Sequence, residues 1–225
     1  MDSLATQEGM KATRMSGEEF FARARSRLTL EVPPALTDDT IAAKRGDLDL
    51  DPSLWERAGV KATRPAAVLV GVVDRTEPMV LLTQRNAALE AHAGQIAFPG
   101  GKIESGDASP AAAALREACE EIGLDARLVE PIGYLDLYLT FSGFRILPTV
   151  ARVDPAYRIV LNRTEVDEAF EVPLAFLMDA QNHALHSRDW KGVIRHYYAM
   201  AFPQRYIWGV TAGILRNLYD RICRG

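Results

Sequence analysis

Residues 101–124 read GKIESGDASPAAAALREACEEIGL, a segment with clear signals for a turn and a helix. Ser109 followed by Pro110 is a usual beginning of a helix, because serine caps the first free N–H groups and proline suits the first helical position. Gly123 suits the residue that ends a helix. The sequence therefore predicts a helix over 110–122 that follows a glycine turn.

Three acidic residues of this helix, Glu117, Glu120 and Glu121, have the i, i+3, i+4 spacing that places them on one side. The opposite side is apolar and is expected to pack on the core; its residues are Ala111, Ala112, Leu115, Ala118, Cys119 and Ile122. Like charges at this spacing repel, and a hard divalent cation with oxygen ligands turns that repulsion into binding. A solvated face of charges is the alternative. Two features favour the metal: the helix dipole disfavours acids in the last turns, and the glycine turn lets backbone approach a ligand closely.

The order of residues 116–124, REACEEIGL, resembles the second half of the Nudix hydrolase signature. The first half departs from that signature. Asp107 stands where the family has Glu, and eight residues rather than seven separate Asp107 from Arg116. The Nudix subgroup that resembles coenzyme A pyrophosphatases tends to carry the same aspartate and the same extra residue.

An upstream pattern extends the resemblance to that subgroup over roughly residues 65–220. The chain reads LLTQRN over 81–86 and FPGG over 98–101, in the register of the subgroup. Two positions depart from the pattern, since Asn86 replaces Ser and Glu90 replaces Arg. The charge reversal at Glu90 leaves the enzyme class intact but weakens coenzyme A as the substrate. ADP-ribose or another nucleoside diphosphate derivative therefore stays open.

The resemblance implies a cofactor, Mg²⁺ or Mn²⁺, held by Glu117, Glu120, Glu121 and the backbone carbonyl of Gly101. Glu120 and Glu121 are also expected to act in catalysis. Arg116 is expected to join them by pairing with one glutamate and orienting it. The alternative for Arg116 is a simple surface ion pair, which contributes little.

Substrate contacts are expected from Arg85, at the end of a predicted strand, and from the turn at Gly100 and Gly101. A guanidinium group suits phosphate because it donates parallel hydrogen bonds, although Arg85 could instead pair with a carboxylate. The catalytic base is sought at Glu165 and Glu168, since Nudix enzymes often draw a further carboxylate from this region. A solvated loop is the alternative for both.

The implied reaction is hydrolysis of a diphosphate bond. Water activated by the metal attacks one phosphorus, and the other half leaves as a phosphomonoester. With coenzyme A as substrate, the products are adenosine 3′,5′-bisphosphate and 4′-phosphopantetheine. A non-catalytic Nudix module that binds a ligand is the second alternative, but it predicts a damaged metal site, whereas the Arg-Glu-Glu-Glu half of the signature is complete.

Before and after the acidic helix, the sequence predicts further helices and apolar strands. Ser16 and Glu19 have the spacing of a capping box at the beginning of a helix, and a second short helix is expected after Pro52. A long helix is predicted over 206–222, with a short one at 174–179. The predicted strands are 66–73, 79–83, 95–98, 127–138, 144–153, 157–161, 184–189 and 193–201.

This mixture predicts an α/β (α+β) fold of the Nudix type, a mixed sheet sandwiched between helices, with a short helical N-terminal extension. Residues 1–60 are assigned to the extension, which combines a polar tail with a helix. Residues 61–225 are assigned to the Nudix hydrolase domain.

The composition of this 225-residue chain limits the classes of partner that it is expected to bind. Its net charge of −4 indicates no basic surface, so the expected partner is a small molecule and not nucleic acid. The longest apolar run is too short to cross a bilayer, and the N-terminal residues lack a stretch of the signal-peptide type. Two cysteines without metal-ligand spacing fit a reducing compartment. We expect a cytoplasmic protein without a membrane partner, and its oligomeric state stays open.

Overall fold

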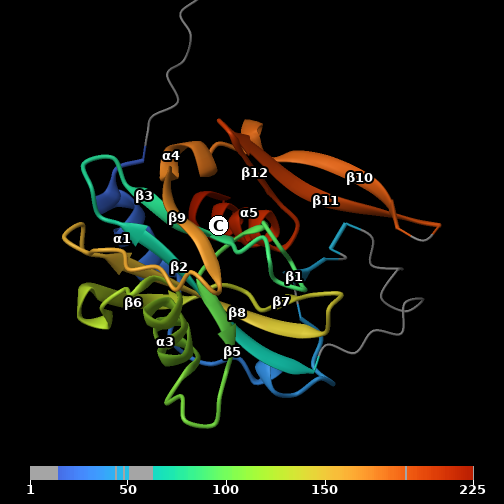
Figure 1. Cartoon of the computed structure of the whole chain (residues 1–225), viewed down its shortest axis with the longest axis horizontal. Helices are drawn as coiled ribbons and strands as arrows, with labels where there is room; N and C mark the ends of the chain where they lie inside the picture. The colour runs from blue at the N-terminus through green and yellow to red at the C-terminus, as the bar shows by residue number, and fades with distance from the viewer. Residues whose placement is uncertain (1–14, 44, 48, 51–62, 191, 225) are drawn as a thin grey trace, which may run out of the picture.

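The structure is a computed structural model that describes residues 15–43, 45–47, 49–50, 63–190 and 192–224 (Figure 1). The polar tail over 1–14 and the helix expected after Pro52 lie outside the described residues. The described helices are α1 (Gly17–Arg27), α3 (Pro110–Ile122), α4 (Leu174–Leu177) and α5 (Val210–Tyr219), which runs into a π-helical turn at Asp220–Arg224. Short 3₁₀ turns lie at Pro34–Leu36, Ala126–Leu128 and Ala180–Asn182.

Two sheets occur in the part of the chain that the structure describes. The smaller sheet has the order β10 (Ala184–Trp190), β11 (Val193–Phe202) and β12 (Arg205–Trp208). The larger sheet holds nine strands: β1 (Arg45–Gly46), β2 (Arg64–Val73), β3 (Met79–Arg85), β4 (Ile96–Ala97), β5 (Gly100–Lys102), β6 (Val129–Tyr134), β7 (Tyr138–Leu139), β8 (Phe144–Val153) and β9 (Val166–Pro173).

The larger sheet is mixed because β2 has parallel and antiparallel neighbours. It pairs in parallel with β8 along its whole length, from Arg64 opposite Phe144 to Val73 opposite Val153. Its other edge pairs antiparallel with β5 near one end and with β3 near the other. The site described below lies where β5 meets β2.

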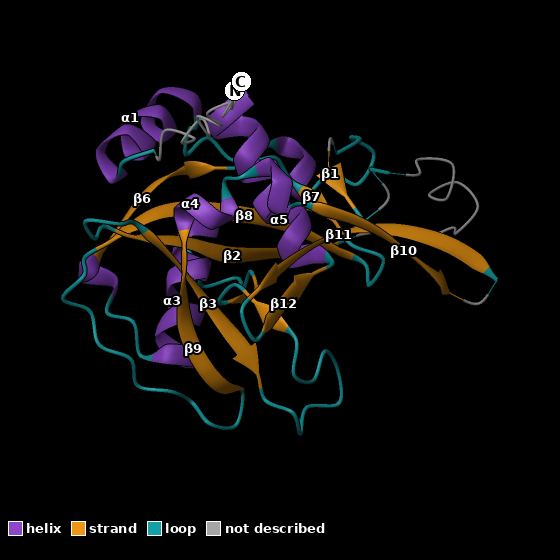
Figure 2. Ribbon diagram, turned by 90° about the horizontal axis from the view of Figure 1, so that it is seen from above, coloured by secondary structure: helices purple, strands orange, loops and turns teal. Residues whose placement is uncertain are grey.

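Helices cover both faces of this sheet (Figure 2). Successive side chains of a strand point to opposite faces. Leu69 of β2 accordingly packs in a cluster with Ala118 of α3. Its neighbour Val70 belongs to the cluster that holds Phe20 of α1 and Leu215 of α5. The predicted architecture, a mixed sheet between helices, is thereby confirmed.

The helix starts predicted at Ser16 and Ser109 are also confirmed. Ser16 caps α1, and its hydroxyl accepts a hydrogen bond from the Glu19 N–H at 3.1 Å. Ser109 caps α3 in the same way, and Gly123 ends that helix in the left-handed conformation, with φ of 67°. In α1 the apolar residues turn inward, so this helix shares one core with α5.

The strand predicted at 157–161 is wrong. This segment runs as an irregular chain along the end of α3. The Val160 N–H donates to the Ile122 carbonyl, and the Asn162 N–H donates to the Glu121 carbonyl, each at 2.9 Å. The last carbonyls of a helix have no partner within it, and here the segment satisfies them, so its backbone does not join a sheet.

Two further differences concern the C-terminal half. Residues 166–173 form β9, which pairs with β3, although their acidic residues obscured a strand pattern. The helix predicted over 206–222 begins only at Val210, because residues 205–208 form β12 and Gly209 turns the chain with φ of 64°. None of the helices in the described ranges is long and apolar enough to cross a membrane.

Candidate functional site

In the acidic helix α3, Glu121 points toward the sheet, which the sequence did not indicate. Glu121 is only 3% exposed, and Ala114 and Ala118 beside it are fully buried. Cys119, predicted for the apolar side, is exposed. The prediction that the carboxylates stand opposite the packed side is therefore wrong for Glu121, whereas it holds for the exposed Glu120. The row of alanines is thin enough to bring the helix close to the sheet, and Glu121 lies in that contact.

The glycine turn at β5 faces these carboxylates. The Gly100 N–H donates to Oε2 of Glu121 at 3.3 Å. A Cβ atom at Gly101 would collide with the Glu117 carboxylate, so only glycine leaves room for that side chain. The absence of side chains at this turn is what lets the two glutamates approach the backbone of β5.

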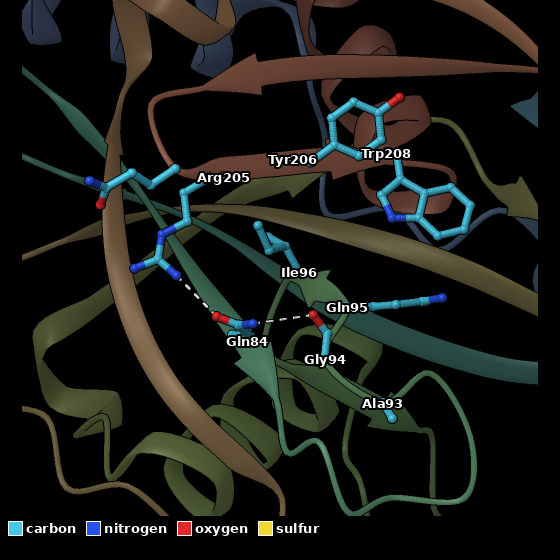
Figure 3. A pocket seen from close by; sticks show the side chains of 9 residues that line it. Gln84, Ala93, Gly94, Gln95, Ile96, Arg205, Tyr206 and Trp208 are labelled. Atoms are coloured by element: carbon cyan, nitrogen blue, oxygen red, sulfur yellow. Dashed lines mark hydrogen bonds between the residues drawn. The ribbon is translucent and has the colours of Figure 1, made fainter.

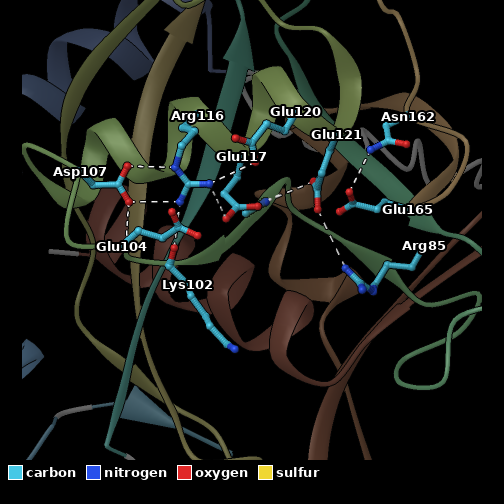
Figure 4. A network of polar contacts seen from close by, with 11 residues as sticks. Arg85, Lys102, Glu104, Asp107, Arg116, Glu117, Glu120, Glu121, Asn162 and Glu165 are labelled. Atoms are coloured by element: carbon cyan, nitrogen blue, oxygen red, sulfur yellow. Dashed lines mark hydrogen bonds and ion pairs between the residues drawn. The ribbon is translucent and has the colours of Figure 1, made fainter.

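Arg116 holds the outer part of the acidic group together (Figure 4). Its Nε and Nη2 donate to the two oxygens of Asp107 at 3.0 and 3.1 Å. Its Nη1 donates to Glu117 at 2.9 Å and to Glu120 at 3.1 Å, and Nη2 also reaches the Lys102 carbonyl at 3.1 Å. Hydrogen bonds from Arg116 lower the pKa of Asp107. The aspartate that departs from the family signature is thus the anchor of this arginine.

The inner part of the group contains Arg85 and Glu165 (Figure 4). Arg85, the last residue of β3, places Nη1 4.0 Å from Oε1 of Glu121. The pairing with a carboxylate that was the alternative for Arg85 is therefore present, with Glu121 as the partner. Glu165 lines the same cavity as Glu117 and Glu121, and its carboxylate accepts a hydrogen bond from Asn162 at 2.9 Å.

Glu168, the other candidate base, lies elsewhere. Its carboxylate pairs with Nη2 of Arg205 at 2.5 Å. Arg205 also donates to Gln84 at 3.0 Å in a separate pocket of about 370 Å³ (Figure 3). The structure therefore brings Glu165 to the acidic group and leaves Glu168 outside it.

Burial disfavours the charged forms of the inner carboxylates, Glu117 and Glu121, because it removes them from water. It raises the pKa of Glu121 to about 7, against the opposing effect of Arg85 and of the Gly100 N–H. Burial also raises the pKa of Glu117, and the charge of Glu165 adds to the shift of both groups. A group of carboxylates that resist losing their protons is one that a bound cation would stabilise.

The donors available to a cation are all oxygens, which suits hard divalent ions. Glu117, Glu121 and the backbone of β5 present them toward the cavity. Glu120 is 54% exposed and faces Arg116. Within the described residues, no three His, Cys, Asp or Glu side chains already converge on one point. The chemistry of the donor set fits a divalent ion, and Glu117 would have to share its carboxylate between that ion and Arg116.

A cavity of about 810 Å³ opens in front of the glutamates. Asn86 and Glu90, the two departures from the subgroup pattern, are not among its lining residues, and Glu90 is exposed. Two arginines that the sequence analysis did not single out, Arg188 and Arg195, do line it. They lie on different strands, and the sequence held no signal that pairing would bring them together.

The fold and the acidic helix define an α+β protein of the Nudix type. The family model described as NUDIX domain matches residues 62–191. The chain therefore belongs to the Nudix hydrolase family, whose members generally use divalent metal ions.

Two relatives from enterobacteria share the name "Uncharacterized Nudix hydrolase NudL". The protein of Cronobacter sakazakii is 42% identical over 163 residues, which cover 69% of this chain and 81% of the relative. The protein of Escherichia coli K12 is 39% identical over 155 residues, with the same coverage. Among solved structures, the Nudix hydrolase from Alicyclobacillus acidocaldarius matches with a TM-score of 0.44 at 20% identity, over 71% of this chain and 92% of that one.

Proposed function

We propose that the protein hydrolyses the diphosphate bond of a nucleoside diphosphate derivative, with coenzyme A as the first candidate. One observation carries the proposal. The buried Glu121 and the half-buried Glu117 face a side-chain-free turn at the wall of a cavity of about 810 Å³. That volume is of the size that binds small organic ligands. The products from coenzyme A would be adenosine 3′,5′-bisphosphate and 4′-phosphopantetheine.

Mg²⁺ or Mn²⁺ would be held by Glu117, Glu121 and the Gly101 carbonyl, with Glu120 at the outer side. Such an ion, when bound, neutralises diphosphate oxygens and lowers the pKa of water. Arg116 is a positioning residue, because its hydrogen bonds to Asp107 and Glu117 set the direction of the latter carboxylate.

The remaining steps fall to side chains of the cavity wall. Arg85 has a guanidinium group that can bind a phosphate oxygen of the substrate. Its Nη1 lies 4.0 Å from Oε1 of Glu121, so the guanidinium group is beside the proposed metal site. Glu165 can accept the proton of the attacking water, since its carboxylate lines the cavity and is oriented by the hydrogen bond from Asn162. Gly100 and Gly101 have no side chains, so the substrate can approach the backbone at this turn.

The position of Glu90 removes the objection that its negative charge raised against coenzyme A as a substrate. Its negative charge would oppose an anionic ligand if it faced the cavity. It is exposed and lies outside the lining, so solvent screens it. ADP-ribose, which has the diphosphate but no further phosphate, is the comparison substrate. The complete Arg-Glu-Glu-Glu group argues for an enzyme over a module that only binds its ligand.

The test is a substrate panel with purified full-length protein. Coenzyme A, dephospho-coenzyme A and ADP-ribose are incubated with Mg²⁺ or Mn²⁺, and phosphomonoester products are quantified by chromatography. We expect hydrolysis of at least one diphosphate, with a dependence on the metal that a chelator reverses. A folded protein that leaves every diphosphate intact with either metal would contradict the proposal.

A further inference from the structure

A strand of the predicted N-terminal extension reaches the wall of the cavity. β1 pairs in parallel with β7, and Figure 1 and Figure 2 both draw these two strands side by side. Arg45, Gly46 and Asp47 line the same cavity as the acidic group. Residues assigned to the extension therefore form part of the wall around the proposed substrate site.

Two contacts hold this strand in place. The Asp47 N–H donates to the Leu139 carbonyl at 2.9 Å, which continues the pairing with β7. Nη2 of Arg45 pairs at 3.0 Å with Asp220, directly after α5, and the two side chains are 29% and 17% exposed. The strand is thus attached both to the larger sheet and to the end of α5.

The carboxylate of Asp47 accepts two hydrogen bonds from the segment that joins β7 to β8. Its Oδ1 accepts from the Tyr138 hydroxyl at 3.1 Å, and its Oδ2 accepts from the Phe141 N–H at 2.8 Å. Tyr138 is only 5% exposed, and a buried hydroxyl needs a partner within the protein. Asp47 therefore connects the extension to a side chain and to the backbone of this segment.

Helix α5 restricts the same tyrosine from another direction. A Cβ atom at Gly213 of α5 would collide with the ring and the hydroxyl of Tyr138. The phenol is therefore confined between α5 and the Asp47 carboxylate. This confinement gives the hydrogen bond a fixed direction, and the carboxylate can pass that direction on to Phe141.

The turn that Asp47 holds is itself a wall of the cavity. Thr140, Phe141 and Ser142 all belong to its lining. The Phe141 ring also contacts Arg195 of β11, whose guanidinium carbon lies 3.7 Å from the ring centre, and Arg195 lines the cavity as well. A displacement of the Phe141 backbone would therefore change the position of the turn and its contact with β11 together.

We propose that Asp47 is a positioning residue of the catalytic cavity, which holds the turn at 140–143 in the arrangement that binds the substrate. The inference rests on the proposed function, because the cavity is the proposed substrate site. Asp47 acts through Tyr138 and Phe141, whereas the acidic group that serves the chemical step lies on α3 and β5. Substrate affinity, more than the rate of the chemical step, should therefore depend on Asp47.

Two substitutions at this position separate hydrogen bonding from charge. Asp47→Ala removes both hydrogen bonds. In Asp47→Asn the amide oxygen can accept from the Phe141 N–H, and the amide nitrogen can donate to the Tyr138 oxygen. Burial raises the pKa of Asp47, against its two hydrogen bonds and the charge of Arg195, so a neutral amide suits this environment.

Two further variants complete the set. Tyr138→Phe removes one of the two hydrogen bonds and keeps the ring. Asp39→Ala is the matched control, because Asp39 is an exposed residue of the same extension and is not among the residues that line the cavity.

The experiment measures binding and turnover separately in the full-length protein. Coenzyme A and ADP-ribose are titrated by calorimetry into wild type and each variant with a chelator present, so that metal-dependent hydrolysis does not interfere. Steady-state kinetics with Mg²⁺ then give KM and kcat. Thermal melting shows whether each variant is folded.

We expect Asp47→Ala to weaken binding of the tighter probe about tenfold and to raise KM by a similar factor, with kcat within about threefold of wild type. Asp47→Asn and Asp39→Ala should resemble wild type, and Tyr138→Phe should lie between. A loss that the amide restores identifies positioning by hydrogen bonds, since a general loss of stability would lower the melting temperature without this split between KM and kcat.

Wild-type affinity in a folded Asp47→Ala protein would overturn the inference, as would an Asp47→Asn protein that binds as weakly as Asp47→Ala. If Asp47→Ala does not fold, wild-type affinity in Tyr138→Phe would overturn it instead. A wild-type protein that binds neither probe would do the same. Absence of hydrolysis in the substrate panel would reject the proposed function, whereas the affinities measured without metal would still decide the role of Asp47.

Discussion

At the scale of single residues, Glu121 is the clearest case in which a buried charge lowers stability at a position proposed to serve function. A carboxylate that is 3% exposed loses most of its hydration. Its nearest compensating groups are the Gly100 N–H at 3.3 Å and Arg85 at 4.0 Å. A protein selected only for stability would place an apolar residue here, so the burial of an acid is in line with the proposed role of Glu121 in binding a cation.

The substitution Glu121→Gln should reduce turnover by more than about a hundredfold, because it removes a charge from the proposed metal site at nearly constant shape. The melting temperature should stay equal or rise, since the variant no longer buries an ionisable group. Product release and thermal melting measure the two effects. Glu130→Gln, on β6 outside the cavity lining, is the control. Turnover of wild-type size in Glu121→Gln would remove this residue from the site.

At the scale of elements, the contact between β5 and α3 shapes the site. The helix begins at a serine cap, ends at a glycine and presents small side chains to the sheet, while β5 meets it with two glycines. Because both surfaces lack bulk, the carboxylates of α3 can lie against the backbone of β5.

Gly101→Ala tests this contact. The new Cβ would collide with the Glu117 carboxylate, which is the movable end of a side chain, so the fold should survive while Glu117 is displaced. We expect about a tenfold or larger loss of turnover with a small change in melting temperature. Gly106→Ala is the matched control, because a Cβ there meets nothing within 4 Å. A Gly101→Ala protein with unaltered turnover would show that the close approach is unnecessary.

An ion pair between the β2–β3 turn and β9 predicts a pH dependence of stability. Arg75 donates to Glu171 at 2.7 and 2.9 Å and lowers the pKa of that carboxyl from its ordinary value of 4.5. A lowered folded-state pKa stabilises the fold above pH 4.5, and this contribution disappears as the pH falls through the folded value.

Urea unfolding of wild type and Glu171→Gln measures this effect. At neutral pH the variant should be less stable by about 1 kcal/mol, because the pair is partly exposed. The two proteins should converge in strongly acidic solution. Glutamine can still accept the hydrogen bond from Tyr157, so the comparison isolates the charge. A difference that stays constant with pH would assign the loss to packing.

At the scale of the whole molecule, the helix near the N-terminus and the helix near the C-terminus belong to one core. Phe20 of α1 is fully buried in the cluster that includes Leu215 and Leu218 of α5. Arg27 of α1 donates to the Ile222 carbonyl at 2.8 Å, which adds a polar contact between the same two regions. Residues more than 190 positions apart in the chain therefore stabilise each other.

Phe20→Ala should lower the free energy of unfolding by about 3–5 kcal/mol, as expected for a large cavity in a packed core. Chemical denaturation followed by circular dichroism and by tryptophan fluorescence measures it. Both signals should shift together, because α1 and the sheet share one cluster. Leu30→Ala, at a residue 47% exposed, should change stability little. A separate early transition in one signal would show that α1 unfolds independently of the sheet.

The sequence alone determined the features that depend on local order. The caps at Ser16 and Ser109, the stop at Gly123 and the apolar runs of β2 and β8 were legible because each depends on residues within a few positions. The order of residues 116–124 was likewise enough to indicate the Nudix family. Local chemistry and a short motif need no knowledge of the tertiary fold.

Only the tertiary structure established in which direction the site residues point and which residues they contact. Glu121 points into the α3–β5 contact because alanine rows let the helix approach the sheet. Residues 157–161 complete the end of α3 although their pattern resembles a strand. Glu165 joins the acidic group while Glu168 pairs with Arg205, and the hairpin register sets Arg188 opposite Arg195. Each outcome depends on packing or pairing between distant segments, whose energies no local pattern contains.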